Sequence, residues 1–177
     1  MPNHVRNRLL IEAPQSEHAA ILEKFCDKGA PCFERLIPIP GVYLGSTSSV
    51  HSSLFGEEHC FHTGCSNAWG TKWGPYSIEE PVSSKGTLLL QFETAWDAPH
   101  PVILELAKHL GHPMRHTWCC EGEMTYGWIE YDATGHTTRI SSKSGTYADP
   151  IGEKAPDAVT AEAMYAELFP ERQDDDD

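Results

Sequence analysis

The densest group of ring-bearing and charged side chains is Trp69-Gly70-Thr71-Lys72-Trp73. In a strand, Trp69, Thr71 and Trp73 would share one face, and Lys72 would point to the other. Two tryptophans beside a cation form a platform on which a nucleobase or another planar ring can stack. The same tryptophans could instead fill the core, with Gly70 allowing a close backbone approach. We favour the core interpretation, because the strongly negative net charge opposes nucleic acid.

A second candidate site is the segment His59-Cys60-Phe61-His62-Thr63-Gly64-Cys65. Zinc takes four nitrogen or sulfur ligands around a tetrahedron. Cys60, His62 and Cys65 could supply three of them, and either Cys119 or Cys120 could supply the fourth. Only one of that pair could join, since adjacent residues of a strand point to opposite faces. The spacing is not that of a standard zinc knuckle. We therefore expect free thiols and no cofactor, with structural zinc as the alternative.

Acidic residues near the second half of the chain are a third candidate. Glu121 and Glu123 could form an acid/base cluster with Asp97 and Lys72 if their loops converge. Glu121-Gly122 also fits a simple turn between two strands. The sequence has no glycine-rich phosphate loop, no Ser-His-Asp signature and no metalloprotease helix. We assign no catalytic residue and favour a protein that is not an enzyme, with an enzyme as the open alternative.

The charge balance indicates the class of partner. Thirteen basic residues face 26 acidic ones, which gives a net charge of −13. Such a field repels nucleic acid and anionic membranes, and it attracts basic surfaces. The sequence has neither an apolar run long enough for a bilayer nor the apolar core of a signal peptide. We expect a cytoplasmic chain whose partner is a protein, with no direct contact to nucleic acid or membrane.

Apolar spacing predicts the elements that must position these residues. A strand over residues 5–12 precedes a helix that Ser16 caps and Gly29 ends. A second helix, which Asp97 would cap, has prolines in its first turn and ends at Gly111. The remaining elements are strands over residues 87–92, 115–120, 125–131 and 137–141, and a terminal helix that begins at Thr160 with Met164, Tyr165 and Leu168 on its apolar face.

This order of elements predicts an α+β fold with an antiparallel sheet of the ferredoxin-like, split β-α-β kind. Residues 1–145 would form the ferredoxin-like domain. Residues 41–66 are rich in Gly, Ser and Thr without clear periodicity, so we expect a loop inserted in that domain. Residues 146–177 would add an extension with one helix and an acidic tail, Asp174 to Asp177.

Five segments together resemble a known family. The segments are Pro2-Asn3 with Asn7, Phe33 with Leu36 to Pro40, Trp69 to Trp73, Phe92-Glu93-Thr94-Ala95-Trp96 running into Pro99, and Glu121-Gly122 followed by Gly127. In this order they resemble the YubB-like, ferredoxin-like family of uncharacterised proteins carried by phages and conjugative plasmids. The resemblance covers roughly residues 2–135.

The resemblance implies a fold and a setting but no reaction. The motif positions Trp69, Gly70, Thr71, Lys72, Trp73, Thr94, Trp96, Glu121, Gly122 and Gly127 become candidates for a binding site or for the core. With the charge, the setting favours an acidic interaction protein in the cytoplasm of a host cell. Its partner would be a host defence or nucleic-acid-binding protein with a basic surface. The alternative is an enzyme that binds a small ligand or nucleotide through Trp69 to Trp73 and nearby acids.

Overall fold

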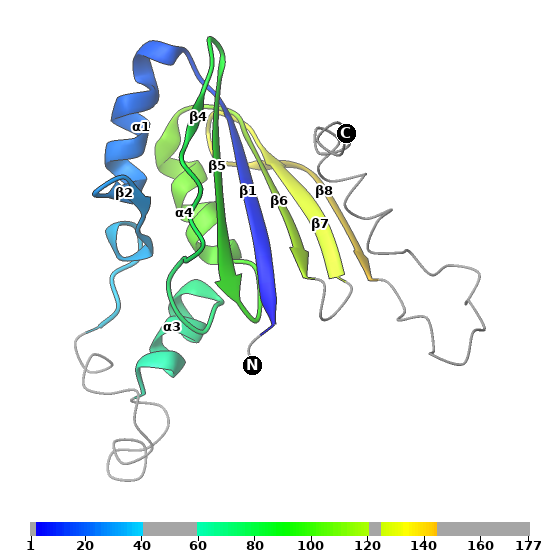
Figure 1. Cartoon of the computed structure of the whole chain (residues 1–177). Helices are drawn as coiled ribbons and strands as arrows, with labels where there is room; N and C mark the ends of the chain where they lie inside the picture. Colours follow the sequence, from blue (N-terminus) through cyan, green and yellow to red (C-terminus); the bar gives the residue numbers. More distant parts are fainter. Residues whose placement is uncertain (1–2, 41–59, 121–124, 145–177) are drawn as a thin grey trace, which may run out of the picture.

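The computed structural model describes residues 3–40, 60–120 and 125–144, which form one large sheet with helices gathered on one side of it (Figure 1). The elements are β1 (His4–Glu12), η1 (Gln15–Glu17), α1 (His18–Phe25), β2 (Cys26–Asp27), β3 (Ala30–Pro31), η2 (Phe33–Arg35), α3 (Phe61–Trp69), β4 (Val82–Ser83), β5 (Thr87–Ala95), α4 (His100–Leu110), β6 (Met114–Cys120), β7 (Thr125–Tyr131) and β8 (Thr137–Ser144). Within these residues, none of the helices has the length and apolarity to cross a membrane.

The sheet has six strands in the order β4-β5-β1-β6-β7-β8. β1 lies between β5 and β6 and runs antiparallel to both, so β5 and β6 are parallel to each other. α4 connects them across β1, which makes β5-α4-β6 a split β-α-β unit. Short antiparallel connections add β7 and β8 at one edge. The α+β, ferredoxin-like fold predicted from the sequence is confirmed.

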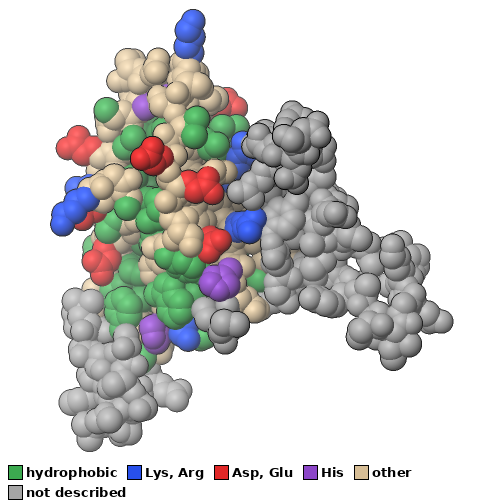
Figure 2. Space-filling view, viewed as in Figure 1, with side chains coloured by type: hydrophobic (Ala, Val, Ile, Leu, Met, Phe, Trp, Pro, Cys, Tyr) green, Lys and Arg blue, Asp and Glu red, His purple; other side chains and the backbone are tan. Residues whose placement is uncertain are grey.

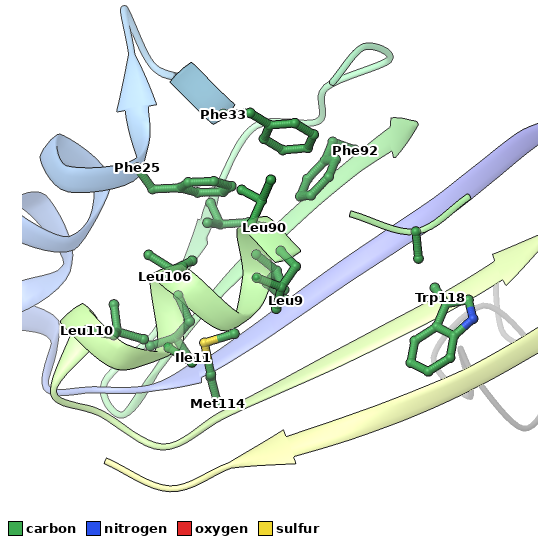
Figure 3. Close-up of a cluster of buried hydrophobic side chains, with 14 of the residues drawn as sticks. Leu9, Ile11, Phe25, Phe33, Leu90, Phe92, Leu106, Leu110, Met114 and Trp118 are labelled. Atoms are coloured by element: carbon green, nitrogen blue, oxygen red, sulfur yellow. The ribbon is translucent and has the colours of Figure 1, made fainter. Parts of the chain in front are cut away.

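The core lies between the helices and one face of the sheet (Figure 3). β1 alternates buried and partly exposed residues, and its buried positions include Leu9 and Ile11. β5 shows the same period on the same face, and α4 packs its apolar stripe against both strands. Phe25, Phe33 and Phe92 complete the core with ring centroids 5.9–6.4 Å apart.

The first helix differs from its predicted limits. Ser16 does not cap it, because Ser16 lies in the 3-10 turn η1 and α1 begins at His18. α1 also ends at Phe25, before Gly29. Lys28 and Gly29 both have positive φ, 51° and 86°, and form the tight turn between β2 and β3. Gly29 therefore serves a hairpin and not a helix end.

The expectation of a loop over residues 41–66 is wrong at its C-terminal end. Phe61–Trp69 is the helix α3, in which Cys65 and Trp69 are buried. Spacing of four residues along Phe61, Cys65 and Trp69 gives this helix its inward stripe. Residues 41–59 and the predicted extension, residues 146–177 with its terminal helix, lie outside the described residues.

Candidate functional site: an aromatic and lysine cluster beside the end of β5

The segment Trp69 to Trp73 is not a strand, so the shared face considered for a strand does not arise. Trp69 is the last residue of α3 and is only 3% exposed. Its Nε1 donates a hydrogen bond to the carbonyl oxygen of Ile37 at 2.8 Å, and its ring packs edge-on against Phe33 with centroids 5.6 Å apart. The structure therefore places Trp69 in the core and separates it from Trp73.

Gly70 and Thr71 reverse the chain after α3. Gly70 has φ +77°, the left-handed conformation that ends many helices. A Cβ there would also lie 3.3 Å from Cδ of Pro101, at the start of α4. Thr71 is buried and donates its hydroxyl hydrogen bond to the carbonyl oxygen of Trp73 at 2.8 Å. This turn brings Lys72 and Trp73 to the surface, where the Lys72 amide donates to the carbonyl oxygen of Ala95 at 3.2 Å.

The second motif, Phe92 to Trp96, reaches the same place from β5. Thr94 is fully buried, and its hydroxyl donates to the carbonyl oxygen of Asp97 at 2.7 Å. It also accepts a hydrogen bond from Nδ2 of Asn7 at 2.9 Å. Beyond these anchors, Trp96 has φ +77°, and its side chain is 47% exposed. A left-handed backbone is strained for a bulky residue such as tryptophan, and such strain is concentrated at functional sites.

Lys72, Trp73, Tyr76 and Trp96 form what we call the aromatic–lysine cluster. The Lys72 ammonium lies 4.4 Å from the ring centroid of Trp96 and 5.2 Å from that of Trp73. Trp73 and Tyr76 have ring centroids 6.3 Å apart. The lysine therefore contacts tryptophans from both motifs, as cation–π pairing favours. Figure 2 shows hydrophobic and histidine side chains together with a basic side chain at this end of the molecule.

Two histidines extend the cluster. His62 of α3 lies with its ring centroid 5.7 Å from that of Trp73, and its Nδ1 is 3.1 Å from the carbonyl oxygen of Lys72. His4 of β1 packs edge-on against Tyr76, whose hydroxyl lies 2.8 Å from the His4 Nδ1. Burial, and then the nearby Glu93 carboxylate, raise the pKa of Tyr76 above its ordinary value. Tyr76 is therefore a neutral phenol at neutral pH.

A small cavity adjoins the cluster. Its volume is about 160 Å³, and it is lined by Arg6, Asn7, Ser77, Glu79, Gln91, Phe92 and Glu93. Tyr76 connects the two features, because its backbone pairs with that of Glu93 through hydrogen bonds of 3.0 and 2.8 Å. The Glu93 carboxylate is 3.6 Å from His4 and 3.8 Å from Arg6. The cavity therefore presents charges of both signs next to the partly exposed ring of Tyr76.

Behind the cluster lies a buried polar network that the sequence analysis did not find. Asn7 donates to Thr94 and to the carbonyl oxygen of Val5, so its Oδ1 is left to accept from His116 Nε2 at 3.0 Å. His116 is fully buried, and burial with the neighbouring His100 holds its pKa well below the ordinary value. It is therefore the neutral tautomer with the proton on Nε2. The sequence does carry one sign of this network: His116 is a polar residue at a strand position that alternates with Met114 and Trp118 and therefore faces the core.

The predicted metal ligands are not brought together. Cys65 is buried in α3, where burial is the main cause that raises the pKa of its thiol to about 12. Cys119 lies on β6, on the face of the sheet away from the helices. Cys60 and His62 lie at and near the start of α3. Across residues 3–40, 60–120 and 125–144, no three His, Cys, Asp or Glu side chains are placed to hold a metal ion.

The remaining motif positions do not belong to the aromatic–lysine cluster. Glu121, Gly122 and Glu123 lie outside the described residues. The strand β6 ends just before them, at Cys120. Cys120 pairs with Val5 of β1, and Val5 pairs on its other side with Thr94 of β5. Asp97, the predicted cap, does not cap α4. Its carboxylate accepts a hydrogen bond from the Ala98 amide at 2.7 Å, and the helix begins at His100 after the cap residue Pro99.

Gly127 is held by packing. It lies opposite Trp118 in the register of β6 and β7. A Cβ at this position would come within 2.4 Å of the carbonyl oxygen of Ser141 and 2.7 Å of the Trp118 ring. Gly127 therefore makes room for an indole and for the neighbouring strand, away from the aromatic–lysine cluster.

Comparison with known proteins agrees with this architecture. A family model described as the ferredoxin-like domain in Api92-like protein matches residues 68–161, which is more than half of the chain. A crystal structure of the protein api92 from Yersinia pseudotuberculosis is similar, with a TM-score of 0.56 and 11% sequence identity over 83% of this chain and 100% of that one. No curated protein matches. The phage or plasmid setting stays a prediction. The chain belongs to the Api92-like family and carries its ferredoxin-like domain.

Proposed function

We propose that this chain is a non-catalytic binding protein and that the aromatic–lysine cluster is the centre of its contact surface. The observation that carries the proposal is Trp96, a half-exposed indole on a left-handed backbone. A buried network anchors the residues on either side of it, through Thr94 and Asp97. Tryptophan and tyrosine are the residues that most often dominate binding energy at protein interfaces. A rigidly placed, half-exposed indole suits such a role.

The partner we infer is a protein with a basic surface. Acidic side chains lie near the cluster: Glu79 and Glu93 line the adjoining cavity, and the exposed Asp97 follows Trp96 in the chain. An arginine or lysine from a partner could stack on the tryptophans and pair with these carboxylates. The Lys72 ammonium beside Trp96 shows that a cation fits against this indole. The net charge of −13 would speed the encounter at low salt.

The setting completes the proposal. The five-motif resemblance points to a phage or plasmid, so the chain would act in the cytoplasm of a host cell. A host defence or nucleic-acid-binding protein carries the basic surface that an acidic protein can occupy. The chain would thus inhibit such a protein by covering the site where a phosphate backbone binds.

A second candidate function rests on the cavity beside the cluster. A volume of about 160 Å³ accommodates a small polar molecule, and Tyr76 with Trp73 offers rings for stacking nearby. Arg6 and the two glutamates of the lining could orient a ligand with charges of both signs. In this case the chain would bind a small ligand or a nucleotide, and a partner protein would not be needed.

The test compares the wild type with Trp96→Ala and with Ile140→Ala, a matched control in which another exposed apolar side chain is removed from β8. Fluorescence anisotropy would measure binding of an arginine-rich peptide, a glutamate-rich peptide and a single-stranded oligonucleotide at low and physiological salt. We expect the wild type and the control to bind the arginine-rich peptide and to bind it less tightly as salt rises. Trp96→Ala should weaken this binding by about tenfold or more.

Two results would contradict the proposal. Equal affinity of Trp96→Ala and wild type for the arginine-rich peptide would mean that diffuse charge, and not the cluster, attracts cations. Tight binding of the oligonucleotide would contradict the preference for a basic protein partner, and binding of free nucleotides in the cavity would favour the second candidate.

A further inference from the structure

The outer face of the sheet, which we define as the face turned away from α1, α3 and α4, is covered more than the described elements explain. Cys119 of β6 and Tyr126 of β7 are register partners on this face, and they are only 1% and 3% exposed. Their neighbours along the strands, Cys120 and Gly127, point to the helix side. All helices of the described residues pack on that other side (Figure 1). A tyrosine on a bare sheet face would keep much of its ring in contact with solvent.

The same face carries several arginines, which is unusual in so acidic a chain. Arg6 and Arg8 of β1 share it, by the alternation of the strand, with Arg115 of β6 and Arg139 of β8. The guanidinium carbons of Arg115 and Arg139 lie 4.5 and 5.3 Å from the ring centroid of Trp128. The Glu130 carboxylate lies between them, 3.9 and 3.7 Å away. Apolar and cationic groups are thus adjacent on this face.

We propose that the C-terminal extension, residues 146–177, binds the outer face of the sheet. The sequence of the extension complements that face in two ways, by apolar side chains and by negative charge. Met164, Tyr165 and Leu168 follow a helical spacing and offer an apolar stripe to Cys119 and Tyr126. The extension also offers carboxylates to the arginines of the outer face, from Glu162, Glu167 and Asp174 to Asp177.

The connection allows this docking. The described chain ends at Ser144, the last residue of the edge strand β8. The roughly 15 residues from there to Thr160 can span up to about 50 Å. Neighbouring strands are about 4.8 Å apart, so β6 lies only about 10 Å from β8. The extension belongs to the same chain, so its effective concentration at this face is high, and this offsets the long-range repulsion by the net charge.

Adjacent cysteines provide the test, because Cys119 faces the proposed contact and Cys120 faces the helices. The full chain, a Met164→Glu and Leu168→Glu double variant, and the control Ala166→Glu, which adds a charge on the opposite side of the predicted helix, would be labelled with N-ethylmaleimide. Mass spectrometry would give the rate at each cysteine. We expect Cys119 to be labelled about tenfold faster or more in the double variant only, with Cys120 protected throughout.

A second measurement does not depend on weakening the contact. In a Met164→Cys variant, a short bis-maleimide should join the new thiol to Cys119 within one chain. Unchanged protection of Cys119 in the double variant would overturn the proposal, and so would cross-links that form only to other cysteines. Protection of wild-type Cys119 that is lost on dilution would also overturn it, because a second copy of the chain would then cover this face.

Discussion

The ammonium of Lys72 lies 4.4 Å from the ring centroid of Trp96 although 24 positions separate the two residues in the sequence. Two turns produce the contact: the left-handed Gly70 that ends α3, and the left-handed Trp96 that ends β5. Each motif thus contributes a buried half that fixes the backbone and an exposed half that meets the other motif. The first two predictions follow from this division.

The two tryptophans Trp69 and Trp96 should respond oppositely to removal. Trp69→Ala should lower the free energy of unfolding by about 3–5 kcal/mol, because it leaves a cavity in the core and an unsatisfied carbonyl at Ile37. Trp96→Ala should change it by no more than about 1 kcal/mol, the value of an exposed cation–π contact. Urea unfolding of both variants would measure this. A large loss for Trp96→Ala would show that the indole serves stability rather than binding.

Trp96→Gly should be more stable than Trp96→Ala by about 1 kcal/mol. Both variants lose the same ring, but only glycine adopts φ +77° without steric cost. Thermal unfolding of the two variants would measure the stability cost of the left-handed backbone alone. A Trp96→Gly variant that is less stable than Trp96→Ala would mean that the backbone at this position is not strained.

Gly127→Ala should lower the free energy of unfolding by about 2–3 kcal/mol, because its Cβ would overlap the Ser141 carbonyl and the Trp118 ring. Gly86→Ala is the matched control, since a Cβ at Gly86 meets no atom within 4 Å. Chemical denaturation of the two variants would measure the difference. Similar stability for both would show that β8 does not lie against Gly127 in solution.

The protein should lose stability as the pH falls below about 6.5. The folded state holds the pKa of His116 well below that ordinary value, and burial also lowers the pKa of His100. The unfolded state therefore binds protons that the folded state refuses, so acid favours unfolding, by up to about 1.4 kcal/mol per pH unit for each histidine. Unfolding free energies from pH 7.5 to 5 would show the slope. His116→Gln should reduce it, whereas an unchanged slope would assign the effect to other groups.

Purified, untagged protein should contain far less than one zinc ion per chain. Cys65 is a buried thiol with a pKa of about 12, and Cys119 lies on the other face of the sheet, so neither is poised to join Cys60 and His62. Elemental analysis by mass spectrometry would check this. Stoichiometric zinc that disappears in a Cys60→Ser or Cys65→Ser variant would contradict it.

Periodicity predicted those parts of the fold in which local pattern and tertiary packing agree. The alternation of β1 and the stripe Val102, Ile103, Leu106 and Leu110 of α4 each define one buried face, so their elements were found. α3 was missed because its apolar positions are separated by Gly, Ser and Thr, which are typical of loops. The alternation of residue types in Trp69 to Trp73 is compatible with a strand, because a left-handed Gly70 leaves no mark on that alternation.

The candidate site required long-range information. Asn7 and His116 are 109 positions apart, and their hydrogen bond follows from the register of β1 against β6. No spacing along the chain encodes such a pair. The motif positions were nonetheless informative, since Lys72, Trp73, Thr94 and Trp96 all lie at or directly behind the cluster.

The central position of β1 has a consequence for synthesis on the ribosome. β1 is the first strand to be made, yet its partners are β5 and β6, with His4 paired to Ala95 and Val5 to Cys120. At about 5–20 residues per second, roughly 5–20 s pass between the completion of β1 and that of β6. Both backbone edges of β1 stay unpaired until β5 has been made, and Leu9 and Ile11 stay without the cover of α4 until residue 110. The nascent chain is therefore a substrate for chaperones until nearly the whole domain has emerged, and folding is limited by closure of these long loops.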